Sequence, residues 1–274
     1  MRHPHRFAQL ALAAALTLTA AAPARAQQDR AQQWLARCRD RDGWGDRGRF
    51  CDVRNFTVDR PGASVRVDAG PNGGVDVFGW DKPSMLVVAR IQANGDDDAD
   101  ARNVAGRITI DVGAAGAHAD GPSAEGHRGW SVSYDVYLPR ATALDVTSHN
   151  GGVSVTGVNA RQDLSTVNGG IQLADVAGDV HAETTNGGVS AVLSGTAWQG
   201  AGLDLRTTNG GVTLEIPRGY NARLETGTTN GGFSTDFPIT VQGSFRRRIT
   251  TTLGKGGAMV RATTVNGGVR IRER

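Results

Sequence analysis

The chain has 274 residues, of which 30 are Lys or Arg and 27 are Asp or Glu, so its formal net charge is +3. Three of the arginines, Arg2, Arg6 and Arg25, precede residue 27; without them acidic and basic residues balance, which removes the charge basis for nucleic-acid binding. Hydrophobic residues make up 39%, too many for a disordered chain. Glycine accounts for 38 of the 274 residues, roughly twice its usual share of about 7%.

Residues 1–26 have the pattern of a secretory signal peptide. Arg2 and Arg6 supply a positive start, an alanine-rich apolar run extends from Phe7 to Ala22, and Ala24-Arg25-Ala26 has the small residues of a signal-peptidase site. The uninterrupted apolar run is shorter than the ~20 residues of a membrane span, so we expect cleavage and no transmembrane segment in the mature protein. The predicted location is the periplasm, or the secreted or cell-surface space.

The only two cysteines, Cys38 and Cys51, lie in an N-terminal segment, residues 27–55. In an oxidising compartment their default state is a disulfide, which would stabilise the fold by about 3 kcal/mol through loop closure. A redox pair is less well supported, since the spacing is not Cys-x-x-Cys and no histidine lies beside them. Residues 27–37, around Trp34, are compatible with a short helix.

Residues 56–140 are predicted to be mainly strand and to form the first part of a repeat domain. Apolar and polar residues alternate around Asn72, where Pro71 makes this copy of the repeat irregular. One short helix is expected near residues 97–106, because the acidic residues at its start suit a helix N-terminus. Residues 113–129 lack periodicity and are predicted to form a loop.

Residues 141–274 contain the repeat that decides the fold class. Asn-Gly-Gly recurs, and each of its last six copies has a hydroxyl residue two positions before the asparagine and an apolar residue three positions after it. The residue six positions before is apolar except at Gln162. Such alternation is strand periodicity, and Asn and Gly tolerate the positive φ of tight corners. The six corner asparagines are Asn150, Asn168, Asn186, Asn209, Asn230 and Asn266.

Two architectures fit this pattern. Asn-Gly is a strong hairpin signal, so a meander of antiparallel hairpins is one of them. In the other, a β-solenoid, each unit is one coil and equivalent residues stack, which explains the matched positions and would place the asparagines in a ladder. We therefore predict an all-β, β-solenoid or β-helix-like stack of Asn-Gly-Gly repeats, with Thr263–Arg274 as its charged end.

The run Trp130–Pro139 (WSVSYDVYLP), followed by spaced T-x-N-G-G-V-x-V units, resembles the bacterial putative-adhesin family of β-strand repeat proteins, a domain of unknown function. The similarity covers roughly residues 60–274. It implies a β-solenoid in a periplasmic or surface protein. It supplies no active-site residues and does not extend to the cysteine-containing segment.

A predominantly acidic row lies five residues before the corner asparagines. Neighbouring coils of a solenoid are about 4.8 Å apart, so these side chains would form a column and repel one another unless a cation or arginine intervenes. We interpret the row as a candidate ligand-facing strip, with Ca²⁺ as a possible ligand and no other cofactor expected. The alternative is a solvated face. The row consists of Asp145, Asp163, His181, Asp204 and Glu225, followed in sequence by Arg261.

An enzyme is a third possibility, because Asp145 and Asp163 on stacked coils could supply the carboxylate pair, about 5–5.5 Å apart, of a retaining glycosidase. Short regular units leave little loop from which to build a cleft. We therefore predict a non-enzymatic, adhesin-like binding or scaffold protein of the bacterial cell envelope, with a polysaccharide or a cell-envelope protein as partner. An envelope structural or stress-related protein acting through protein partners, and a carbohydrate-active enzyme, are the alternatives.

Overall fold

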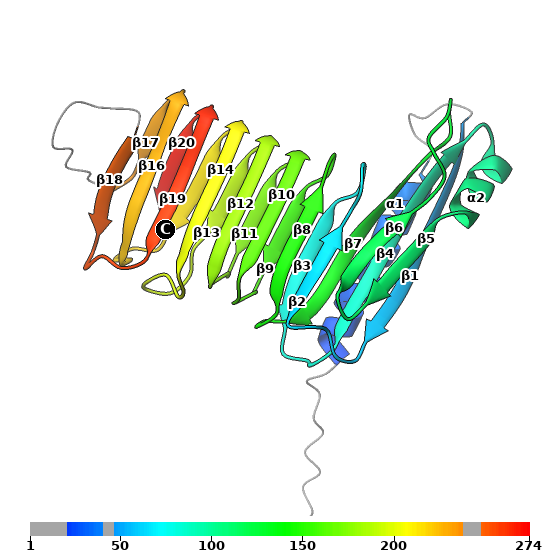
Figure 1. Ribbon diagram of the computed structural model, residues 1–274, viewed down its shortest axis with the longest axis horizontal. Helices are drawn as coiled ribbons and strands as arrows, with labels where there is room; N and C mark the ends of the chain where they lie inside the picture. Colours follow the sequence, from blue (N-terminus) through cyan, green and yellow to red (C-terminus); the bar gives the residue numbers. More distant parts are fainter. Residues whose placement is uncertain (1–20, 41–46, 238–247) are drawn as a thin grey trace, which may run out of the picture.

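The computed structural model describes residues 21–40, 47–237 and 248–274 (Figure 1). Two helices occur in these residues, α1 at Ala21–Arg39 and α2 at Asp98–Gly106. Neither of them combines the length and the apolar composition needed to cross a bilayer. Most of the predicted signal peptide, residues 1–20, lies outside the described residues, and its cleavage stays a prediction.

The strands of the described residues form two sheets of ten strands each, called sheet A and sheet B. In spatial order, sheet A contains β1 (Gly48–Val58), β4 (Met85–Gly95), β7 (Gly129–Pro139), β3 (Val75–Trp80), β9 (Val153–Thr156), β11 (Ile171–Ala174), β13 (Val189–Val192), β15 (Val212–Ile216), β20 (Val269–Glu273) and β17 (Phe233–Thr235). Sheet B contains β18 (Arg248–Leu253), β16 (Ala222–Asn230), β19 (Met259–Asn266), β14 (Gly202–Asn209), β12 (Asp179–Asn186), β10 (Gln162–Asn168), β8 (Ala143–Ser148), β2 (Ser64–Asp68), β6 (Gly116–Asp120) and β5 (Thr109–Gly113).

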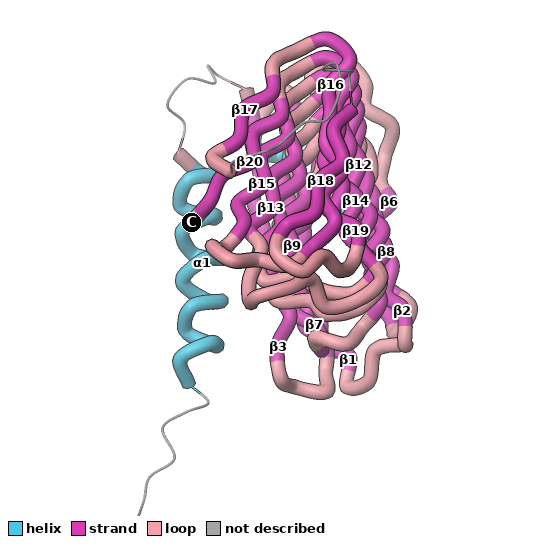
Figure 2. Tube along the Cα trace, turned by 90° about the vertical axis from the view of Figure 1, so that its left-hand side faces the viewer, coloured by secondary structure: helices cyan, strands magenta, loops and turns pink. Residues whose placement is uncertain are grey.

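Each Asn-Gly-Gly unit is one coil of a solenoid. A coil places one strand in sheet B, turns at its corner and places the next strand in sheet A, as β10 and β11 do. Equivalent strands of neighbouring coils pair in parallel and in register, and the coils follow one another along the long axis (Figures 1 and 2). The predicted β-solenoid fold is confirmed, and a hairpin meander is excluded for the repeats because it would require antiparallel pairs.

The core lies between the two sheets and is filled by alternate residues of each strand. The inward positions of β8 and β12, Leu144 and Val180 among them, are almost completely buried. Gln162, the exception in this apolar row, is also buried, and its Nε2 donates to the carbonyl oxygens of Val158 and Ala177. A polar side chain is tolerated there because it satisfies backbone acceptors in the turns between coils.

Side-chain hydrogen bonds join each corner to the next coil. The hydroxyl two positions before the asparagine donates to the carbonyl oxygen of the first glycine of a neighbouring corner, as Thr184 does to Gly169 over 2.8 Å. The asparagine side chains form a ladder in which each Nδ2 donates to the Oδ1 of the neighbouring asparagine on the side nearer Asn72, over 2.7–3.0 Å. In spatial order the ladder contains Asn72, Asn150, Asn168, Asn186, Asn209, Asn266 and Asn230.

The last repeat in the sequence is not the last coil in space. Strands β19 and β20 lie between β14–β15 and β16–β17, and β18 pairs with the far edge of β16 (Figure 1). The prediction that Thr263–Arg274 forms the end of the stack is therefore wrong. Its physical reason is that every coil presents the same corner and backbone register, so pairing does not require neighbours in sequence.

The segment before the solenoid is joined to it by a disulfide. Cys38 near the end of α1 and Cys51 in β1 are bonded, as predicted, with a Cα–Cα distance of 6.2 Å. Helix α1 packs against β1 and β4 on the outer side of sheet A, visible beside the strands in Figure 2. The domain limits predicted after residues 26, 55 and 140 stay predictions; residue 55 lies within β1.

The helix predicted near residues 97–106 is present as α2, whereas the loop predicted after it at 113–129 contains a strand. Asp97 caps the helix, since its side chain accepts a hydrogen bond from the Asp100 amide over 2.7 Å. The predicted loop at 113–129 is wrong in part, because β6 runs parallel to β2. A Cβ on Gly116 would collide with the Arg66 carbonyl oxygen, so this short strand needs a glycine instead of an apolar residue.

The two glycines of one corner, Gly187 and Gly188, test whether the backbones of neighbouring coils approach too closely for a side chain. A Cβ on Gly187 would lie 2.1 Å from the Gly169 carbonyl oxygen, whereas one on Gly188 would lie 3.4 Å from the Gly211 oxygen. We expect Gly187→Ala to lower the free energy of unfolding by about 3 kcal/mol and Gly188→Ala by less than about 1 kcal/mol. Urea titration measures both, and equal losses would contradict the corner geometry.

Candidate functional site

The parallel register places one ionisable residue of each coil in a straight row on the outer face of sheet B. We call it the charged row; its inward neighbours, such as Leu144 and Val146, are buried. The acidic residues and His181 predicted from the sequence are brought together there, but the order differs from the sequence because β19 is inserted. In spatial order the row contains Arg66, Asp145, Asp163, His181, Asp204, Arg261 and Glu225.

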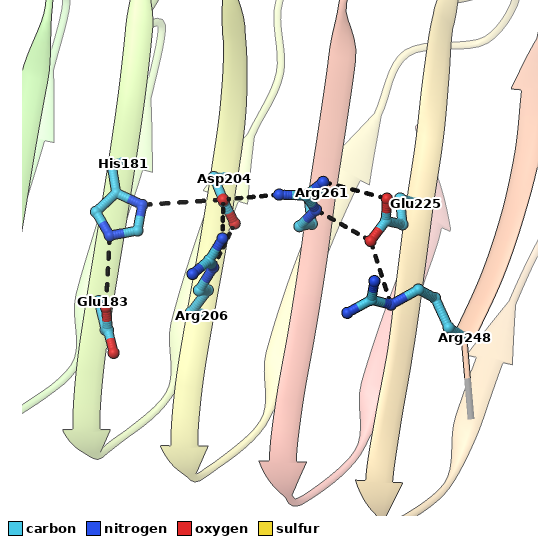
Figure 3. Close-up of polar contacts among 7 residues, drawn as sticks. All are labelled: His181, Glu183, Asp204, Arg206, Glu225, Arg248 and Arg261. Carbon is cyan, nitrogen blue, oxygen red and sulfur yellow. Dashed lines mark hydrogen bonds and ion pairs between the residues drawn. The ribbon is translucent and has the colours of Figure 1, made fainter.

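An ion-pair network occupies the half of the row nearest β18 (Figure 3). Arg261 contacts Asp204 at 3.2 Å and donates to both carboxylate oxygens of Glu225 at 3.1 and 3.2 Å. The hydrogen bonds to Glu225 raise the pKa of Arg261. Arg206 also pairs with Asp204, at 2.6 Å. The guanidinium of Arg261 therefore separates two carboxylates that would be direct neighbours if the coils followed chain order.

Glu225 differs from the other predicted row residues in being buried. Its side chain is only 10% exposed and also pairs with Arg248 of β18, at 3.3 Å. Its role in the geometry is thus to join β16, β19 and β18. His181 lies at the other end of the network, 3.4 Å from Glu183 and 4.0 Å from Asp204.

The opposite half of the row opens into a groove of about 550 Å³ between the hairpin β5–β6 and strands β2 and β8. Arg66 and Asp145 line it and pair with each other at 2.8 Å. Asp68, Asp111 and His118 also line it, so donors and acceptors face the same opening. This groove and the adjoining row are the candidate binding surface of the described residues.

The proposed carboxylate pair does not form an isolated acid–base couple. Asp145 pairs with Arg66 of the neighbouring coil, and Asp163 pairs with Arg161 at 2.6 Å. Among the described residues, no cluster of three or more His, Cys, Asp or Glu side chains is arranged to hold a metal ion. The arrangement presents paired charges and hydrogen-bonding groups along the row.

Arg66 is the row residue that sequence reasoning missed. Counting five positions back from Asn72 gives Val67, because the extra residue at Pro71 shifts the frame by one. The register instead pairs Arg66 with Asp145 and Val67 with Val146. Alternation of buried and exposed residues, counted from Val65 instead of from Asn72, was the signal that could have found it.

A second ionic cluster, also missed, lies on sheet A. Arg90 of β4 contacts Asp76 of β3 at 3.2 Å and Asp135 of β7 at 3.0 Å. The Asp135 side chain is 2% exposed, and burial raises its pKa to about 6, while Arg90 opposes the shift and Asp76 adds to it. Arg30 of α1, whose guanidinium lies 4.6 Å from the Phe78 ring centre, also lowers this pKa.

Comparison with known proteins identifies the family. The profile described as Toastrack DUF4097 matches residues 88–272, well over half of the chain. The chain belongs to the Toastrack family. This confirms the resemblance to a putative-adhesin family of unknown function. No functionally curated protein matches the chain.

Solved structures similar to this Toastrack chain include a putative cell adhesion protein from Clostridium sporogenes, 8% identical, with a TM-score of 0.43 over 82% of this chain and 100% of that one. A putative adhesin from Bacteroides fragilis is 12% identical, with a TM-score of 0.40 over 82% and 97%. Another from Parabacteroides distasonis is 10% identical, with a TM-score of 0.33 over 82% and 97%.

Removal of the shared arginine tests the ion-pair network. Arg261→Leu leaves Asp204 and Glu225 without their common partner, and we expect it to lower the free energy of unfolding by about 2 kcal/mol. Arg270→Leu, on the exposed face of β20, is the control and should cost less than about 0.5 kcal/mol. Adding Glu225→Gln should recover part of the loss, and an unchanged loss in that double variant would contradict the proposed charge balance.

The raised pKa of Asp135 predicts a specific pH dependence. Because the folded-state pKa of about 6 exceeds the ordinary value of 3.8, the folded state binds this proton more tightly, and the contribution of Asp135 becomes more stabilising as pH falls from 7 to 4. Relative to Asp135→Asn, the wild type should gain on the order of 2 kcal/mol over this interval. Urea titrations of both proteins at several pH values measure the difference; a constant difference would contradict the shift.

Proposed function

We propose that this Toastrack protein is a non-enzymatic binding scaffold of the bacterial cell envelope, which contacts an extended partner through the charged row and its groove. The observation that carries the proposal is the unbroken register of the row across successive coils. Because neighbouring strands are about 4.8 Å apart, side chains in this register form a long, regular face instead of a closed pocket. A polymer or the surface of another protein can contact many coils of such a face at once.

The chemistry of the groove suits a hydroxyl-rich polymer. Arg66, with 73% of its side chain exposed, offers hydrogen-bond donors, and Asp145 beside it offers acceptors. Since Arg66 and Asp145 already pair with each other, a neutral or weakly charged polysaccharide can bind beside them without leaving either ion unpaired. We therefore favour a bacterial polysaccharide as the partner, with a cell-envelope protein as the second choice.

The predicted location is consistent with this role. A disulfide such as Cys38–Cys51 is typical of oxidising compartments, and residues 1–26 have the pattern of a signal peptide. We propose export to the periplasm or the cell surface, where the long face of sheet B would meet envelope polymers.

Binding to immobilised ligands tests the proposal. The mature chain is applied to bacterial glycans, peptidoglycan, envelope proteins and host matrix proteins, with and without Ca²⁺. We expect saturable retention on one class and at least about tenfold weaker binding by Arg66→Ala/Asp145→Ala, a change of about 1.4 kcal/mol. If retention requires Ca²⁺, the binding surface includes a cation held by the carboxylates of the row.

The matched control is Arg218→Ala/Glu273→Ala, which removes an ion pair of similar exposure away from the charged row. It should bind as the wild type does. Retention only on envelope proteins would favour the structural or stress-related alternative, and cleavage of a retained glycan would favour an enzyme. No retention, or equal binding by both double variants, would contradict the proposed surface.

A further inference from the structure

The corner at the open end of the asparagine ladder differs from the corners inside the stack. Asn230 donates through Nδ2 to Asn266 over 2.8 Å, but within the described residues its own Oδ1 accepts no hydrogen bond. Strand β18 covers β16 only from Ala222 to Gly227, so the far side of the Asn230 corner is not paired with it. The open end is also seen at Gly232, where a Cβ would have no described atom within 4 Å.

The backbone amide of the residue after the asparagine also differs between the Asn230 corner and the corners inside the stack. At the corners of Asn186 and Asn209, inside the stack, the amide of the first glycine donates to the asparagine carbonyl oxygen of the next coil: Gly187 to Asn209 over 3.0 Å, and Gly210 to Asn266 over 2.9 Å. Gly267 donates likewise to Asn230 over 3.0 Å. Gly231 has no next coil in the described part of the chain, so its N–H lacks this acceptor.

We propose that Asn230 is a site of spontaneous modification, which converts to aspartate or isoaspartate while the corners at Asn186, Asn209 and Asn266 are protected. In the reaction the Gly231 nitrogen loses its proton and attacks Asn230 Cγ. The new C–N bond closes a succinimide ring and the side-chain amide leaves as ammonia. Water then opens either C–N bond of the ring, so that the net change consumes one water and releases one ammonia.

The geometry explains the selectivity. At Asn186, Asn209 and Asn266 both the attacking nitrogen and the Oδ1 of the reacting amide are held by hydrogen bonds to neighbouring coils. Reaction there requires the stack to open locally, whereas Asn230 reacts from the folded state. The same Asn-Gly dipeptide occurs at all four sites, which removes the neighbouring side chain as an explanation.

Modification would alter the end of the stack. A carboxylate at position 230 has no hydrogen to donate to the Asn266 Oδ1 atom, and it places a negative charge beside that oxygen. The isoaspartate product also lengthens the corner backbone by one carbon. Both changes weaken the attachment of β16 and β17 to β19 and β20.

Site-resolved mass spectrometry tests the proposal. The intact mature chain is kept in mildly alkaline buffer, digested at acidic pH, and each Asn-Gly peptide is measured over time. We expect Asn230 to gain the mass of the amide-to-acid conversion at least about tenfold faster than Asn186, Asn209 and Asn266. In urea-unfolded protein the four rates should agree within about a factor of two, because protection by the fold is lost.

The control variant is Asn230→Gln, whose longer side chain would have to close a six-membered ring, a much slower reaction. It should remove the fast reaction and leave the three protected rates unchanged. Equal rates at all four sites of the folded protein, or a faster reaction at an internal corner, would overturn the proposal.

Discussion

The fold depends on hydrogen bonds that cross from one Asn-Gly-Gly corner to the next. A buried hydroxyl, such as that of Thr184, donates to a glycine carbonyl oxygen of the adjacent coil, and the asparagine amide beside it continues the ladder. The first glycine lets the two backbones approach closely, since any side chain there would overlap the neighbouring carbonyl. Together these contacts fix the register of the strands on both sides of the corner, and the register in turn aligns the outer side chains.

The same corner cannot determine which coil lies beside which. Every coil offers equivalent donors and acceptors, so the corner bonds alone would also permit the coils to follow chain order. The charges distinguish the alternatives, because Arg261 contacts both Asp204 and Glu225 when β19 lies between β14 and β16. Two carboxylates facing each other across neighbouring strands would instead repel. Side chains on the surface of sheet B thus contribute to the order of the coils as well as to the proposed binding surface.

The sequence predicts the repeated coils of the fold, but little of the irregular parts that lie outside the repeat pattern. Alternation around each asparagine predicted the strands, the matched positions from unit to unit favoured the solenoid over a hairpin meander, and cysteine usage predicted the disulfide. The groove could not be predicted, because β6 contains Gly116 where a side chain would collide, and because Pro71 displaces Arg66 from its expected position. The Asp135 cluster was missed for another reason: its partners Asp76 and Arg90 come from separate strands, and only the fold brings them together.

The charged row connects these features with the proposed function. Its regular spacing follows from the corners, its charge balance follows from the inserted coil, and its groove follows from the irregular first repeat. The stack therefore presents a surface whose side-chain chemistry varies from the arginine and aspartate of the groove to the ion-pair network near β18, on a backbone that is nearly identical from coil to coil.

Oxidative cross-linking of engineered cysteines tests the coil order most directly. Thr208 of β14 and Val265 of β19 lie between register pairs that join these two strands, whereas Thr229 belongs to β16, on the other side of β19. We predict that Thr208→Cys/Val265→Cys forms a disulfide and that Thr208→Cys/Thr229→Cys, two strands or about 10 Å apart, does not. Cross-linking of the second pair and not of the first would contradict the inserted coil.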